Sequence, residues 1–196
     1  MENGFFGFMN RIGDIVFLNV VFLITCIPVV TIGNSLIALY CVSLKMAKGE
    51  EGYVVRGYFK AFKDNFKKGI IVGISLELIL AVLIYDAIVL LQSDASYAFP
   101  GFFITVVAIA VIFAMMQYLF PLIARYENTI RNSVKNALLL AVSKLPYTIL
   151  LVLFPLILMA LTYLTSYAYC MIIVCGCSLC AFWQSKLLNR IFKSIE

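Results

Sequence analysis

The chain has 196 residues, of which 64% are hydrophobic and 13% are charged, and its net charge is +5. Soluble domains carry roughly 25% charged residues, so this composition excludes an ordinary soluble globular domain. The chain contains no histidine, which excludes His-based acid–base catalysis and histidine ligation of a metal.

Long uncharged runs predict helices that cross a membrane. Residues 145–185 form one run of 41 positions, residues 15–44 and 95–124 form runs of 30, and residues 70–92 are apolar apart from Glu77 and Asp86. About 20 apolar residues span a bilayer. We therefore predict an all-α fold: a polytopic transmembrane helical bundle with five to six membrane helices and two cytoplasmic amphipathic surface helices.

These elements are expected to form a single transmembrane domain over residues 1–196. In chain order, we expect a broken first element over 15–44, a surface helix over 53–68, spans over 70–92 and 99–124, a surface helix over 126–144, and spans over 145–165 and 167–187.

The broken first element follows from a cluster of helix-breaking residues. Pro28 removes a backbone donor, Gly33 permits unusual dihedral angles, and Asn34 can cap a helix. Thirty helical residues would measure about 45 Å against a hydrocarbon core of about 30 Å. A hairpin of two half-helices fits that excess, and one long tilted crossing is the alternative. The turn is either a structural kink or the wall of a binding site made by Pro28, Thr31, Gly33 and Asn34.

The distribution of cations predicts the orientation in the membrane. Of fifteen Lys and Arg residues, seven lie in 45–69, four in 125–144 and three in 186–193, which makes fourteen. The connections near 93–98 and 165–169 carry none. The positive-inside rule therefore places both basic loops and the C-terminus in the cytoplasm of a cell-membrane protein, and leaves the side of the N-terminus open.

Both basic loops have the pattern of an amphipathic helix at a membrane surface. In the first, four apolar residues at helical spacing (Val55, Phe59, Phe62 and Phe66) run beside four cations (Arg56, Lys60, Lys63 and Lys67), and in the second Arg131 and Lys135 flank a similar stripe. These cations are predicted to contact lipid headgroups or a partner, and no nucleic acid is expected. A shift of 68 residues aligns the two loops, which indicates either a duplicated unit or the shared demands on any loop that precedes a span.

Glu77 is the candidate functional group inside the spans. It lies well inside an apolar run, where a carboxylate is costly unless it is protonated, paired or hydrated. The alternative is a structural acid bonded to a neighbouring helix. Asp86 is nine residues away, projects from the opposite face and is expected near the outer interface.

Three segments resemble the YesL-like family of small bacterial multipass membrane proteins of unknown function. They are P-V-V-T-I-G at 28–33, F-K-A-F-K-D-N-F at 59–66 and F-P-L-I-A-R-Y-E-N-T at 120–129. The chain has Asn34 where that family usually has proline. The resemblance implies an accessory role in carbohydrate uptake, with a sugar permease as partner, and it supplies no catalytic or ligand-binding residue.

We therefore expect a noncatalytic membrane component associated with carbohydrate uptake, and not an enzyme. The alternative is a small-solute transporter or channel in its own right, motivated by the broken element, the possible repeat and Glu77. No cofactor or metal is expected, because the cysteines at 175–180 fit helix packing better than chelation. The expected surroundings are the lipid bilayer, and the pattern does not define an oligomeric state.

Overall fold

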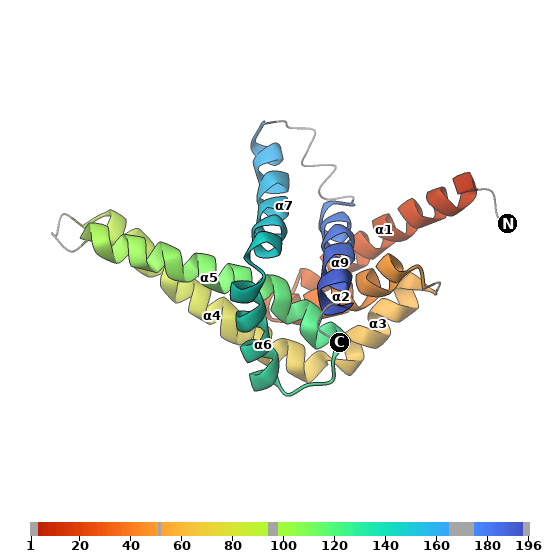
Figure 1. Cartoon of the computed structure of the whole chain (residues 1–196), viewed down its shortest axis with the longest axis horizontal. Helices are drawn as coiled ribbons and strands as arrows, with labels where there is room; N and C mark the ends of the chain where they lie inside the picture. The colour runs from red at the N-terminus through yellow and green to blue at the C-terminus, as the bar shows by residue number, and fades with distance from the viewer. Residues whose placement is uncertain (1–3, 51, 94–97, 165–174, 194–196) are drawn as a thin grey trace.

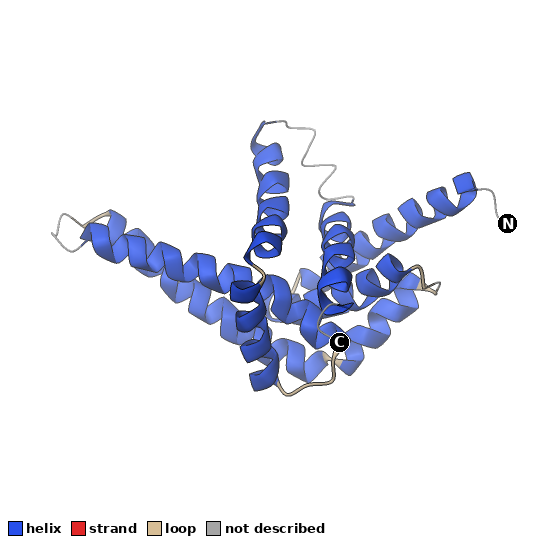
Figure 2. Cartoon of the chain, in the orientation of Figure 1, coloured by secondary structure: helices blue, strands red, loops and turns tan. Residues whose placement is uncertain are grey.

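The computed structural model describes residues 4–50, 52–93, 98–164 and 175–193, and every regular element among them is a helix (Figure 2). This confirms the prediction of an all-α polytopic protein. The elements are α1 (Gly4–Cys26), the short 3₁₀ helix η1 (Val29–Thr31), α2 (Ile32–Lys48), α3 (Val54–Asp64), α4 (Phe66–Leu91), α5 (Ala98–Arg125), α6 (Ile130–Ser143), α7 (Leu145–Leu164) and α9 (Cys177–Lys193).

Four of the described helical segments are long and apolar enough to cross a membrane: α1 from Met9, η1 with α2, α4 and α5. The pair α6 and α7, bent by 100°, makes a fifth if it is counted as one span. The number is close to the predicted five to six. The difference lies at the C-terminal end, where the span predicted over 167–187 begins in residues 165–174, outside the described part of the chain. The helix that follows, α9, has 17 residues and carries basic residues in its last turn.

Helix α2 is the centre of the fold. Within the most apolar 18-residue stretch of its candidate span 61% of the residues are buried, compared with 6% for the corresponding stretches of α4 and α5. It packs against α9, α3, α5, α4 and α1. Around this centre the other helices spread apart: α1 extends to the right in Figure 1, α4 and α5 lie together and extend to the left, and α7 rises between them. The core therefore sits where α2, α9 and the near ends of α1, α4 and α5 meet.

The first element is broken between Cys26 and Ile32. The break is shorter than the predicted turn, because Gly33 and Asn34 lie in the first turn of α2. Gly33 was expected to supply an unusual backbone conformation at the turn, but it does not have a positive φ. Among the described residues, Gly49 is the only glycine that does. Gly33 instead allows a close approach between helices, and the chain changes direction at Pro28, which has an extended backbone.

Each basic amphipathic helix precedes a long apolar helix with one residue between them. Asn65 separates α3 from α4, and Lys144 separates α6 from α7. The predicted surface helices were longer, over 53–68 and 126–144, because the sequence pattern continues through both joints. The chain instead turns there, and α4 already begins at Phe66.

Candidate functional site

A group of hydroxyl side chains ties the break to the surface helix α3. The carbonyl of Thr25, near the end of α1, accepts hydrogen bonds from the hydroxyls of Thr31 (2.6 Å) and Ser35 (3.1 Å). The Thr25 hydroxyl lies 2.6 Å from the hydroxyl of Tyr58 on α3. Burial raises the pKa of Tyr58 to about 12, so the phenol is neutral at physiological pH. Carbonyls freed at the end of α1 are thus satisfied by side chains, as backbone groups at membrane depth require.

Three glycines bring α2 and α4 into backbone contact beside the break. A methyl group on Gly73 would lie 2.9 Å from the Cα of Gly33, and one on Gly33 would lie 2.8 Å from the carbonyl oxygen of Gly69. Gly69 and Gly73 form a G-x-x-x-G spacing, which is typical of closely packed membrane helices. This motif could have predicted from the sequence that α4 packs closely against another helix, but the prediction was not made.

The four residues predicted as a possible wall of a binding site have different surroundings in the structure. Gly33 and Asn34 are buried at the crossing with α4, and the Asn34 amide nitrogen donates to the carbonyl of Phe62 at 2.9 Å. Thr31 is half-buried and bonded to α1, whereas Pro28 is exposed. The contacts of Thr31, Gly33 and Asn34 join helices.

Glu77 lies on α4, one helical turn after Gly73. One of its carboxylate oxygens is fully buried and has no hydrogen-bond partner among the described residues. Helix α4 packs against η1 at the break. The structure thus brings together two features that the sequence identified separately. Asp86 is exposed and accepts a hydrogen bond from the Thr105 hydroxyl at 2.7 Å.

The six cations predicted to meet headgroups or a partner are all exposed: Arg56, Lys60, Lys63, Lys67, Arg131 and Lys135. On α3 the apolar stripe beside them divides into two parts. Val55, Phe59 and Phe66 remain exposed, whereas Phe62 turns inward and stacks on Tyr58 with 6.2 Å between ring centroids. The exposed part leaves an aromatic edge next to a row of cations, which suits the headgroup boundary of a bilayer.

Cysteine labelling tests the predicted orientation of these helices. In a cysteine-free background, Lys63→Cys and Lys135→Cys are expected to react with a membrane-impermeant maleimide only after the cells are permeabilised, because cytoplasmic loops are enriched in Lys and Arg. Both positions are exposed, so poor access within the fold does not limit the reaction. Strong labelling of either cysteine in intact cells would contradict the orientation.

The last turn of α5 connects to the C-terminal helix. The Arg125 guanidinium donates to the Asn189 side-chain oxygen at 3.2 Å and lies 5.1 Å from the centroid of the Phe192 ring. Asn189 in turn donates to the carbonyl of Leu44 at 3.1 Å. The arginine of the F-P-L-I-A-R segment therefore joins α5 to α9, and through it to α2.

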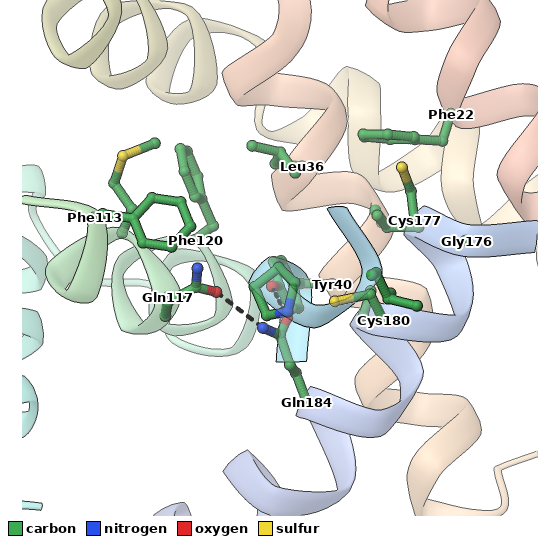
Figure 3. Close-up of a pocket in the computed structure, with 15 residues that line it drawn as sticks. Phe22, Leu36, Tyr40, Phe113, Gln117, Phe120, Gly176, Cys177, Cys180 and Gln184 are labelled. Atoms are coloured by element: carbon green, nitrogen blue, oxygen red, sulfur yellow. Dashed lines mark hydrogen bonds between the residues drawn. The ribbon is translucent and has the colours of Figure 1, made fainter. Parts of the chain in front are cut away.

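A cavity of about 310 Å³ lies among α1, α2, α5, α7 and α9 (Figure 3). Its lining is mostly apolar, but three polar side chains meet there. The Gln184 amide nitrogen donates to the Gln117 side-chain oxygen at 3.0 Å and to the carbonyl of Leu151 at 2.9 Å. The Tyr40 hydroxyl donates to the Gln184 side-chain oxygen at 2.5 Å.

Sequence reasoning missed this cluster. Tyr40 and Gln117 lie in apolar runs, and Gln184 stands at the polar end of one, directly before Ser185 and Lys186. Single polar residues of this kind are a weak signal for hydrogen bonding between membrane helices. Residues 144 apart, such as Tyr40 and Gln184, are brought together only by the packing of α9 on α2.

Long apolar helices, largely exposed apolar faces and basic flanking helices define a multipass membrane protein. Residues 15–87 of the chain match the family described as "Protein of unknown function, DUF624". The match runs from α1 through the break and the glycine crossing into α4, and it agrees with the prediction of an uncharacterised family. No curated protein and no solved structure matches the chain.

Proposed function

We propose that the protein is a noncatalytic integral membrane component that assembles with another membrane protein. The observation that carries the proposal is the paired α4 and α5, which extend away from the core (Figure 1). Within the most apolar 18-residue stretch of each helix, only 6% of the residues are buried within the chain. Such a pair offers two long apolar faces to the surrounding membrane, where a partner's helices can pack.

The exposed side chains on this pair are large and regularly spaced. On α4, Leu78, Val82 and Tyr85 are 63%, 66% and 70% exposed and follow one another at helical spacing. On α5, Phe99 and Phe103 are 81% and 65% exposed. Bulky apolar residues at such spacing supply the close packing that joins helices in a membrane. The YesL-like resemblance makes a carbohydrate permease the first partner to test.

The described buried polar groups support a structural role over an enzymatic one. Thr25, Ser35 and Tyr58 bond to one another and to backbone carbonyls at the break, and Tyr40 and Gln184 are bonded between helices. Polar groups used in this way hold helices together. An enzyme needs several of them to converge on a substrate.

Affinity purification in mild detergent tests the proposed assembly. A tagged wild-type chain is expected to recover a carbohydrate permease from native membranes, and Leu78→Ala with Val82→Ala is expected to lower that recovery at least fivefold by trimming the packed face. The matched control is Phe17→Ala with Ile24→Ala on α1, where the side chains are 65% and 59% exposed. Equal recovery with both double variants, or no permease with any chain, would overturn the proposal.

A transporter or channel is the second candidate, and the buried Glu77 oxygen and the broken first element favour it. Broken helices and buried carboxylates recur where transporters bind coupling ions. Solute flux into liposomes that contain only this protein would support this function, and flux lost in Glu77→Gln would assign the carboxylate to it.

For the accessory component, Glu77→Gln is expected to change neither the folded yield nor the recovery of the permease. The amide has nearly the same shape and can donate as a neutral carboxyl group does. Size-exclusion profiles and the purification described above measure both quantities. A loss of folded protein would instead show that the carboxyl group itself is needed to hold α4 against the break.

A further inference from the structure

The amide of Gln184 has only one orientation that satisfies its neighbours. The carbonyl of Leu151 accepts but cannot donate, so it must face the Gln184 amide nitrogen, 2.9 Å away. The Gln184 oxygen then faces the Tyr40 hydroxyl, which donates to it. A backbone carbonyl therefore sets the direction of the whole hydrogen-bonded chain.

This direction also fixes Gln117. Because the Gln184 nitrogen donates to it at 3.0 Å, Gln117 must present its oxygen to Gln184, and its own NH₂ group points the other way. Figure 3 shows that nitrogen directed toward the part of the cavity where Leu36, Phe113 and Phe120 lie. Gln117 is only 9% exposed, and no hydrogen bond to its nitrogen is found among the described residues. Two N–H donors thus face an apolar cavity.

We propose that this cavity binds a fatty acyl group and that Gln117 donates a hydrogen bond to its carbonyl oxygen. The chemistry of the lining specifies such a ligand. An unpaired amide donor in an apolar site is costly and is satisfied by an acceptor oxygen, whereas the aromatic and aliphatic walls take up a hydrocarbon chain. The volume of about 310 Å³ lies at the lower end of the range for small-molecule sites, which suits part of a single hydrocarbon chain better than a whole lipid.

The membrane itself is the source of this ligand. The cavity is lined by α5 and α7, whose outer faces are apolar and exposed, so an acyl group reaches it from surrounding lipid. Met116, Cys177 and Cys180 line the cavity and are adaptable side chains that accommodate a flexible chain. The acyl group belongs either to a membrane phospholipid or to a free fatty-acid ester, which share the carbonyl recognised here.

Tryptophan fluorescence provides a local measurement of binding. Trp183 is the only tryptophan of the chain, precedes Gln184 on α9 and stacks on Phe154 with 6.0 Å between ring centroids. Bromine atoms on a bound chain quench it at short range. The purified full-length protein in detergent is titrated with methyl dibromostearate and, separately, with dibromooctadecane, which has the same chain without the carbonyl.

The wild-type protein is expected to bind the ester about fivefold more tightly than the alkane, the ratio produced by one net hydrogen bond of about 1 kcal/mol. Gln117→Leu should abolish this preference and leave alkane binding unchanged or stronger. Gln92→Leu, at an exposed position after α4, is the matched control and should retain the preference. If Gln117→Leu does not fold, Leu36→Phe, which narrows the cavity, should weaken both ligands.

Three results would overturn the proposal: unsaturable quenching by both ligands, equal affinities of the wild-type protein for ester and alkane, or a preference that survives Gln117→Leu. The two sources are then separated by repeating the titration with a brominated phosphatidylglycerol. Saturable quenching by that lipid assigns the site to phospholipid, and saturable quenching by the ester alone assigns it to free acyl compounds. Because no partner protein is present, the measurement is independent of the proposed assembly.

Discussion

Gly73→Leu is expected to prevent folding of the protein in the membrane. At this position a single methyl group would already lie 2.9 Å from the Cα of Gly33, and the obstacle is backbone, which cannot rotate aside. Overpacking costs typically 1–3 kcal/mol where side chains can yield, and more where they cannot. The four-carbon side chain must separate α2 from α4, so little monodisperse protein should be recovered by fluorescence-detected size-exclusion chromatography.

Gly33→Ala and Gly73→Ala should show an intermediate effect, seen as a lower melting temperature in detergent. The matched control is Gly13→Ala in α1, where nothing lies within 4 Å of the added methyl group. That change should be neutral or slightly stabilising, because alanine favours a helix by about 1 kcal/mol over glycine. Wild-type stability of Gly73→Leu would show that α2 and α4 do not approach as described.

Tyr58→Ala is expected to destabilise the protein by about 3–5 kcal/mol, the usual cost of deleting a buried aromatic side chain. Tyr58 is completely buried, and its ring and hydroxyl join α3 to the end of α1. Tyr58→Phe isolates the hydroxyl and should cost about 1 kcal/mol, because it leaves the Thr25 hydroxyl without this partner. Reversible unfolding in mixed micelles measures both free energies.

The control for this series is the next residue along the helix. Phe59 is 51% exposed, so Phe59→Ala should change the free energy of unfolding by less than about 0.5 kcal/mol. If Phe59→Ala destabilises the protein as much as Tyr58→Ala does, the buried face of α3 has been assigned to the wrong side chains.

Length and hydropathy were enough to predict the helical fold, because a chain in a bilayer must satisfy its backbone within helices. The long apolar runs correspond to α4 and α5, and Pro28 marks the end of the first helix. The local sequence pattern was less informative at positions where packing between helices determines the conformation of the backbone. Gly33 resembles a turn residue in the sequence, but it lies inside α2 because a glycine is needed at the contact with α4.

The contacts of the candidate sites could be predicted only in part. Exposure of the basic stripe follows from helical spacing, and an acid in an apolar run identifies Glu77 as unusual. A periodic pattern does not show which helices pack together. The convergence of Tyr40, Gln117 and Gln184 could therefore not be predicted from the sequence. Tyr58 was also overlooked, because it lies one position beside the apolar stripe that the pattern emphasised.

The central position of α2 has a consequence for biosynthesis. Helix α2 is completed by residue 48, but α9, which packs against it, begins only at Cys177. Until the ribosome has made α9, the hydroxyl of Tyr40 lacks Gln184, and the carbonyl of Leu44, which is bonded within α2, lacks its second donor, Asn189. The nascent chain must therefore hold a partly polar helix in the lipid for most of its synthesis. Truncation before α9 would leave the Tyr40 hydroxyl without its acceptor on Gln184.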